Sequence, residues 1–206
     1  MSDDLYSSLT RRVEEAFERY DSYFPILHYA VYVPLQGLLD AAAGSISCKS
    51  GCSFCCSRLV VTSRVEGLAL ADYIFGYSSL DPDRVSAAVS THAGALRSFM
   101  DGLTEEKDRN EIWFTKNIPC PFLENALCTV YEARPLSCRT YHSLDDPGKC
   151  KEPLRTVGQE KMLTDAEALF QMVLYRVAAK VDERLAMTGL FSLIMDEIIK
   201  SDMLKK

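Results

Sequence analysis

Residues 48–56, Cys48-Lys49-Ser50-Gly51-Cys52-Ser53-Phe54-Cys55-Cys56, place four cysteines within nine residues. Residues 1–47 and 151–206 contain no cysteine, whereas cysteines that serve as small core hydrophobes would be scattered along the helices. This distribution indicates that the thiols between residues 48 and 150 act together. The remaining four cysteines follow at wider spacing, at Cys120, Cys128, Cys138 and Cys150.

Metal binding is the leading interpretation of these thiols, because cysteines in a reducing compartment do not persist as disulfides. Structural zinc takes four tetrahedral ligands, and iron–sulfur clusters combine closely spaced thiolates with a distant one. An all-sulfur ligand set suits both groups. We favour an iron–sulfur cluster slightly over Zn2+, and both stay open. The candidate metal ligands are Cys48, Cys52, Cys55, Cys56, Cys120, Cys128, Cys138 and Cys150.

The vicinal pair Cys55-Cys56 constrains how the thiols divide between metals. In an extended backbone, adjacent side chains point to opposite faces. These two thiolates would then serve different metals, or one of them would not be a ligand. Two sets of four thiolates would make two metal sites, or one cluster and one zinc site, and the sequence spacing does not choose between these divisions.

Two arginines in the later part of the segment are candidate partners of the thiolates. A metal site with four thiolates carries net negative charge, so nearby cations stabilise it. Arg134 and Arg139 flank Cys138, and we interpret both as cofactor-binding residues that hydrogen-bond the sulfurs or offset their charge. The alternative is that they are solvated surface arginines.

The composition is that of an ordinary globular protein, with 48% of its 206 residues hydrophobic, and it predicts one domain over 1–206. The net charge of −6 argues against DNA or RNA as a partner, because phosphate neutralisation dominates nucleic-acid affinity. No apolar run approaches the ~20 residues of a membrane-spanning helix. The acidic start, residues 1–4, lacks the features of a signal peptide. The sequence predicts a cytoplasmic protein with neither a nucleic-acid nor a membrane partner.

The segments around the cysteines have the apolar spacing and capping residues of helices. An apolar residue recurs at every fourth position from Leu5 to Phe17, behind Asp3 as the expected N-cap. Three pairs of residues predict further helix starts. They are Ser63 with Glu66, Asp81 with Pro82, and Thr164 with Glu167.

We therefore predict a mainly α fold, in which bundle-like helical flanks, 1–47 and 151–206, surround an irregular cysteine-rich metal-binding region at 48–150. The spacing of Cys48, Cys52 and Cys55 also matches the cluster motif of radical S-adenosylmethionine enzymes. Those enzymes resemble partial βα barrels, and this chain offers only one weak strand, at 58–62. The shared spacing is better explained as coincidence.

Four ring-bearing residues allow more than one interpretation. His92 falls on the apolar stripe of its expected helix and is interpreted as a hydrogen-bonded core residue. His142 follows Cys138 by four residues and could replace a thiolate ligand, although eight thiols are available. Trp113-Phe114 is expected to cover the metal site as an apolar lid, and the alternative is an exposed docking patch.

Three motifs that occur in order make the segment recognisable. They are Cys48-x3-Cys52-x2-Cys55-Cys56, Pro119-Cys120-Pro121-Phe122-Leu123 and Cys128-x2-Tyr131-x2-Arg134-Pro135-x2-Cys138-Arg139. Over about 48–150 the pattern resembles the YkgJ-like cysteine-cluster family, whose members are described as zinc- or iron-chelating domains. The resemblance implies that the seven cysteines of these motifs are ligands, with Cys150 as a further candidate. Where many relatives have a glycine this chain has Ser53-Phe54, and Gly51 is expected to supply the turn instead.

Two functions follow as hypotheses. The first is a binding module whose only indicated partners are metal ions and whose thiolates organise the loop region. The second is an iron–sulfur redox or transferase-type enzyme, linked to S-adenosylmethionine, because some larger flagellin lysine methylases carry a similar cluster. The chain has no glycine-rich phosphate loop, and no pair of nucleophile and base stands out. We therefore favour the binding module.

Overall fold

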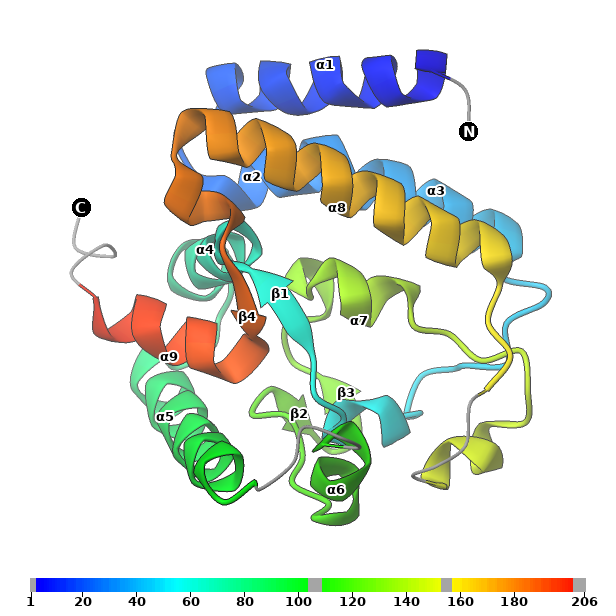
Figure 1. The fold of residues 1–206 in the computed structure, drawn as a ribbon, viewed down its shortest axis with the longest axis vertical. Helices are drawn as coiled ribbons and strands as arrows, with labels where there is room; N and C mark the ends of the chain where they lie inside the picture. Colours follow the sequence, from blue (N-terminus) through cyan, green and yellow to red (C-terminus); the bar gives the residue numbers. More distant parts are fainter. Residues whose placement is uncertain (1–2, 104–108, 153–156, 202–206) are drawn as a thin grey trace.

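The computed structural model describes residues 3–103, 109–152 and 157–201, and this part of the chain is mainly helical (Figure 1). The predicted mainly α fold is confirmed, and residues 48–56 lie in a loop. The α-helices are α1 (Asp3–Arg19), α2 (Tyr23–Leu27), α3 (Val33–Ala42), α4 (Arg64–Asp72), α5 (Pro82–Asp101), α6 (Arg109–Thr115), α7 (Leu136–Thr140), α8 (Lys161–Val181) and α9 (Phe191–Lys200).

Shorter helical turns connect these helices. Two of them are π-helical and extend a neighbouring α-helix, and the others are 3-10 turns in the loops. The π-helical turns are η1 (His28–Tyr32) and η3 (Tyr73–Tyr77), and the 3-10 turns are η2 (Phe54–Ser57), η4 (Tyr131–Ala133), η5 (Pro147–Lys151) and η6 (Glu183–Ala186).

The strands of the described residues form two small antiparallel sheets. β1 (Val61–Ser63) pairs with β4 (Thr188–Leu190), which joins two segments far apart in the chain. β2 (Leu123–Glu124) and β3 (Leu127–Cys128) form a hairpin. Neither sheet has the parallel strand order of a βα barrel.

Both flanks and the cysteine-rich region contribute to one hydrophobic core. Leu35 of α3, Leu136 of α7 and Leu174 of α8 are completely buried in it, and the thiols of Cys120 and Cys128 pack against it. Figure 1 shows α1 over α8, and α8 also contacts α3. The helical flanks thus build the surface against which the cysteine loops are held. Among the described residues, no helix combines the length and the apolar character needed to cross a membrane.

Two of the three predicted helix starts are confirmed. The backbone N–H of Glu66 donates to Ser63 Oγ (3.4 Å) and the Glu66 carboxylate accepts from the Ser63 N–H (3.0 Å), which is a capping box at the start of α4. Asp81 caps α5 by accepting from the N–H of Asp83 (3.0 Å) and of Arg84.

The predicted cap at Thr164 is wrong. Helix α8 begins at Lys161, so Thr164 already lies in its first turn and its hydroxyl donates to the Lys161 carbonyl (2.9 Å). The carboxylate of Glu167 instead accepts from the hydroxyl of Thr140 (2.5 Å) on α7. Asp3 likewise lies within α1 and is not the residue before it.

A buried carboxylate joins the helix that carries Cys138 to the rest of the core. Glu66 is 1% exposed, and besides Ser63 it accepts from the N–H of Leu136 (2.8 Å) and the hydroxyl of Tyr175 (3.2 Å). These contacts connect the starts of α4 and α7 with α8. They satisfy the first amide of α7, which has no partner within the helix.

A second buried carboxylate holds α9 against α5. Asp196 of α9 accepts from Ser90 Oγ (2.6 Å) and from Arg97 Nη2 (2.7 Å), both on α5. Although burial raises the pKa of Asp196, hydrogen bonds from Lys200, Ser90 and Arg97 lower it to about 2. The carboxylate therefore stays ionised and fixes the position of α5.

Substitution of two glycines tests the packing of α4 on α9. A Cβ at Gly67 would lie 2.7 Å from Ile198 Cδ1 and 2.8 Å from Ile194 Cγ2, whereas a Cβ at Gly94 of α5 would meet no atom within 4 Å. Gly67→Ala is expected to lower the free energy of unfolding by about 1–3 kcal/mol through overpacking. Gly94→Ala is expected to raise it by about 0.5–1 kcal/mol, because alanine loses less backbone entropy in a helix. Urea denaturation measures both, and equal stability of the two variants would contradict the packing.

Candidate metal centre

The first cysteine stretch is a tight loop after α3. Gly51 has a φ of +85°, which is the left-handed conformation that glycine adopts without strain, and it supplies the turn expected there. The N–H of Cys52 donates to the Lys49 carbonyl across this turn (2.9 Å). The turn reverses the chain between Cys48 and Cys52.

The backbone of Cys55 and Cys56 is helical and not extended, which corrects the sequence-based assumption about this pair. Both residues lie in η2, and their thiols share a hydrogen bond. That bond lowers the pKa of Cys55 and raises the pKa of Cys56, because one proton held between them leaves the first sulfur charged and the second protonated. Within the pair, the thiolate form is therefore favoured at Cys55 and the protonated form at Cys56.

The second cysteine stretch lies directly beside the first. The N–H of Cys120 donates to the carbonyl of Cys56 (2.7 Å), so residues 64 positions apart are joined through their backbones. The β2–β3 hairpin then pairs Leu123 with Cys128. Helix α7, held by Glu66, supplies Cys138.

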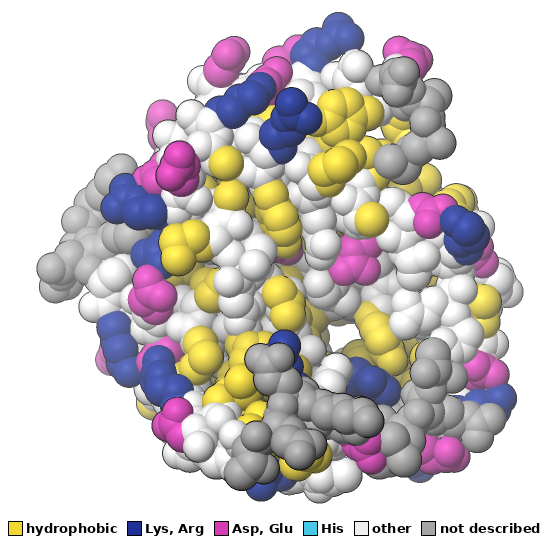
Figure 2. Space-filling view, viewed as in Figure 1, with side chains coloured by type: hydrophobic (Ala, Val, Ile, Leu, Met, Phe, Trp, Pro, Cys, Tyr) yellow, Lys and Arg dark blue, Asp and Glu magenta, His cyan; other side chains and the backbone are white. Residues whose placement is uncertain are grey.

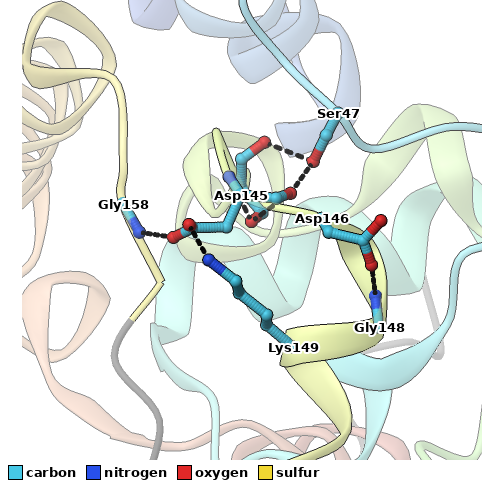
Figure 3. Close-up of polar contacts among 7 residues, drawn as sticks. Ser47, Asp145, Asp146, Gly148, Lys149 and Gly158 are labelled. Atoms are coloured by element: carbon cyan, nitrogen blue, oxygen red, sulfur yellow. Dashed lines mark hydrogen bonds and ion pairs between the residues drawn. The ribbon is translucent and has the colours of Figure 1, made fainter.

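A network of polar contacts joins Ser47, the residue before Cys48, to the loop that leads to Cys150 (Figure 3). The hydroxyl of Ser47 donates to the carbonyls of Ser143 (2.8 Å) and Asp145, and the N–H of Ser143 donates to the Cys48 sulfur (3.3 Å). The Asp145 carboxylate accepts from Lys149 Nζ (2.6 Å) and from the N–H of Gly158 (2.7 Å). The network therefore fixes the 143–150 loop against the first cysteine stretch.

Seven cysteines of both stretches line one cavity of about 860 Å³. Cys150 does not line it, although its residue is buried (6% exposed) in η5, beside η2. Figure 2 shows the molecule hollowed in the lower half of this view, below α7 of Figure 1. The lining cysteines are Cys48, Cys52, Cys55, Cys56, Cys120, Cys128 and Cys138.

The thiols are near one another without being gathered at a single point. Among the described residues, which include all eight cysteines, no three His, Cys, Asp or Glu side chains lie close enough together to hold one metal ion. The seven thiols line the cavity without forming a closed four-ligand site.

Burial determines the protonation of the deeper thiols. It raises the pKa of Cys120 to about 12 and raises the pKa of Cys138 well above its ordinary value, because a charged sulfur is disfavoured away from water. The pKa of Cys128 is also raised by burial. A metal ion reverses this preference by stabilising the deprotonated sulfur.

The electrostatic neighbours of the thiols fall into two groups. The pKa of Cys52 is raised by burial and then by the charges of Cys48, Cys55 and Cys150, which are its electrostatic neighbours. After burial, the pKa of Cys138 is raised by Cys120, Cys55 and Cys128. The thiol of Cys56 likewise interacts with Cys120 and Cys128. We call Cys48, Cys52 and Cys150 the outer group and Cys56, Cys120, Cys128 and Cys138 the inner group, with Cys55 adjacent to both.

The two arginines singled out in the sequence lie in different surroundings. Arg134 lines the cavity, where its guanidinium stacks over the Tyr131 ring (3.9 Å to the centroid) and donates to the Tyr131 hydroxyl (3.1 Å). Arg139 does not line the cavity. It stacks over the ring of Tyr32 (3.8 Å) and donates to the carbonyls of Arg134 (2.9 Å) and Glu132. Arg139 thus braces the loop that carries Arg134.

Arg58 occupies a position beside the thiols that the sequence reasoning did not assign. It lines the cavity between the rings of Phe114 and Tyr141, 5.2 and 5.3 Å from their centroids. The pKa of Cys55 is lowered chiefly by its hydrogen bond with Cys56 and further by the charges of Arg134 and Arg58. In the sequence, the one indication of this role is that Arg58 follows Cys56 by two residues. Other charged residues also lie near cysteines, so this closeness did not single out Arg58.

The residues with alternative interpretations also line the cavity. His92, Trp113 and His142 all do so, and burial lowers the pKa of both histidines. The Trp113 ring lies edge-on to His92 (5.5 Å between centroids) and is 1% exposed. Trp113 is therefore part of the cavity wall and not an exposed docking patch.

Comparison with known proteins gives one informative match. Neither the curated proteins nor the solved structures contain a match to this chain. The model of the CxxCxxCC family, described as "putative zinc- or iron-chelating domain", matches residues 47–162. That region covers more than half of the chain and contains all eight cysteines. This protein therefore belongs to the CxxCxxCC family of zinc- or iron-chelating domains.

Proposed function

We propose that this protein is a metal-binding module in which thiolates from both cysteine stretches hold the metal together. The observation that carries this proposal is the common cavity, which seven cysteines from residues 48–56 and 120–138 line. The backbone hydrogen bond between Cys120 and Cys56 supports it, because it holds the two stretches in contact. Chelation by this domain family agrees with the same function.

The thiols divide into two sets of four in this proposal. The outer group takes Cys55 as its fourth member, since Cys55 interacts with Cys52 and Cys150, and the inner group already has four. Four thiolates are the usual complement of a structural zinc site or an iron–sulfur cluster. The hydrogen bond from the Ser143 N–H to the Cys48 sulfur would orient a ligand of the outer set.

The proposed cofactor of the inner set is an iron–sulfur cluster, with zinc as the alternative. Its four thiols line the cavity without converging on one point, which suits a cluster of several atoms better than a single ion. Arg134 and Arg58 lie where their charge offsets the thiolates, whereas Arg139 would act by holding Arg134 in place.

The identity of the metal is tested by anaerobic purification followed by metal analysis, sulfide analysis and an absorption spectrum. We expect iron together with acid-labile sulfide and a broad visible absorption band. Colourless protein with stoichiometric zinc would favour the zinc alternative. Protein that binds neither metal after reconstitution would contradict the function proposed here.

Single substitutions test the division into two sets. Cys150→Ser is expected to remove the metal of the outer set alone, and Cys138→Ser that of the inner set alone, because a four-thiolate site that loses one ligand loses most of its affinity. The double variant would then lose both. Metal content per protein chain measures this. His142→Gln, at a residue that lines the same cavity, is the control and should keep all of the metal. Complete metal loss from either single cysteine variant would contradict two independent sets.

A further inference from the structure

One part of the cavity lining is apolar and contains no cysteine; we call it the apolar wall. Helices α5 and α6 contribute Leu96 and Trp113, and Leu59 and Leu190 pack beside them in a hydrophobic cluster separate from the main core. Leu96 and Trp113 are 2% and 1% exposed. None of these apolar side chains is a metal ligand. A cavity of about 860 Å³ with a largely apolar wall and a few polar groups has the size and character of a small-molecule site.

Unpartnered polar atoms gather on the same cavity. Among the described residues, buried side-chain nitrogens without a hydrogen-bond partner include Arg58 Nη2, Arg134 Nε, His92 Nδ1 and His142 Nδ1. All four residues line the cavity. A buried polar atom without a partner is destabilising, so four of them on one cavity point to a ligand that satisfies them.

The chemistry of these atoms selects the charge of the ligand. Arginine is always a cation and has donors only, and its planar fork matches a carboxylate or a phosphate. Thiolate-bound metal beside the arginines would keep the surroundings negative, which repels a dianionic phosphate more strongly than a monoanionic carboxylate. The carboxylate is therefore the better match.

Arg58 lies between the cysteines of the cavity and its apolar wall. Its charge acts on Cys55 and Cys150, while its guanidinium contacts the ring of Phe114, next to Trp113 on α6. The neighbouring Leu59 is tied to the start of α6 by a hydrogen bond from its N–H to Asn110 Oδ1 (3.1 Å). A carboxylate held by Arg58 would thus have its body against the α5 and α6 wall.

We infer that this cavity binds a small organic carboxylate beside the metal centre, with its charged group on Arg58 and Arg134 and its apolar body against Leu96 and Trp113. The histidines His92 and His142 complete the polar contacts. The inference goes beyond metal binding, because it assigns the cavity an organic ligand in addition to the metal.

The inference is tested by titration of the purified protein with phenylacetate and hexanoate while Trp113 fluorescence is recorded. Trp113 is the only tryptophan of the chain, so the signal reports on this wall alone. We expect a saturable change with a carboxylate and none with the neutral amides phenylacetamide and hexanamide at the same concentrations. Arg58→Gln should weaken binding by about ten- to a hundredfold, which is the value of a charge-assisted hydrogen bond.

Arg11→Gln, at an exposed residue of α1, is the matched control and should bind like the parent protein. No saturable change with either carboxylate, an equal response to the amides, or unchanged binding in Arg58→Gln would overturn the inference. Metal content is measured on the same samples. Protein that binds metal but no carboxylate refutes only this inference, whereas protein that binds carboxylate but takes up neither metal on reconstitution refutes only the proposed metal function.

Discussion

Removal of the metal is expected to lower the melting temperature of this protein by about 10 °C. A ligand present at a thousandfold excess over its dissociation constant stabilises the folded state by about 4 kcal/mol, and each kcal/mol shifts the melting temperature of a chain of this size by about 2–4 °C. The effect is large because the cysteine loops contain little regular structure. Without metal, half-buried thiols such as those of Cys120 and Cys138, whose pKa is raised, must hold these loops together by packing alone.

Hydrogen exchange shows where this stabilisation acts. Without metal, residues 47–58 and 119–150 should lose protection, whereas α1 and α8 should keep theirs, because the flanks contribute their own buried residues to the core. Addition of metal should restore the parent pattern. A uniform loss of protection along the chain, or an unchanged melting temperature, would contradict a metal-organised loop region.

Glu66→Ala is expected to lower the free energy of unfolding by about 3–5 kcal/mol. The carboxylate accepts from the N–H of Ser63, the N–H of Leu136 and the hydroxyl of Tyr175, and its removal leaves these buried donors without a partner. It also leaves a small cavity between α4, α7 and α8. Because α7 carries Cys138, the loss should also weaken metal binding by the inner group.

Glu197→Ala is the control for this experiment. Glu197 forms an ion pair with Arg64, but its side chain is 64% exposed, and exposed pairs contribute little to stability. The change in the free energy of unfolding should stay below about 1 kcal/mol. Urea denaturation compares the two variants. A loss in Glu66→Ala as small as that in Glu197→Ala would show that the buried network does not hold α7.

Local signals in the sequence predicted local structure well. The caps at Ser63 and Asp81 were predicted because their hydrogen bonds involve residues two or three positions apart. The pair Thr164 and Glu167 has the same spacing, yet Glu167 binds Thr140 of α7, and the helix begins a turn earlier. The Glu167 side chain, which the pattern assigns to a helix cap, instead forms a tertiary hydrogen bond.

The sequence predicts that the cysteines of the candidate site act together, but it does not predict the other residues that line the cavity. The spacing and the family resemblance predicted that cysteines from residues 48–56 and 120–138 would act together, and these residues line one cavity. The wall opposite them is built from α5, α6 and the segment around Leu190, which meet only in the folded chain. No periodicity within one helix shows that His92 and Arg58 share a cavity, so their role could not be inferred from the sequence.

The most direct test of the central claim is alkylation of the folded protein by N-ethylmaleimide, with and without bound metal, followed by mass spectrometry of each cysteine. If thiolates from both stretches hold the metal jointly, metal should protect Cys52 and Cys55 of the first stretch together with Cys128 and Cys138 of the second. Removal of the metal should then expose both stretches to the reagent. Equal labelling of these thiols with and without metal, or protection confined to one stretch, would contradict the account.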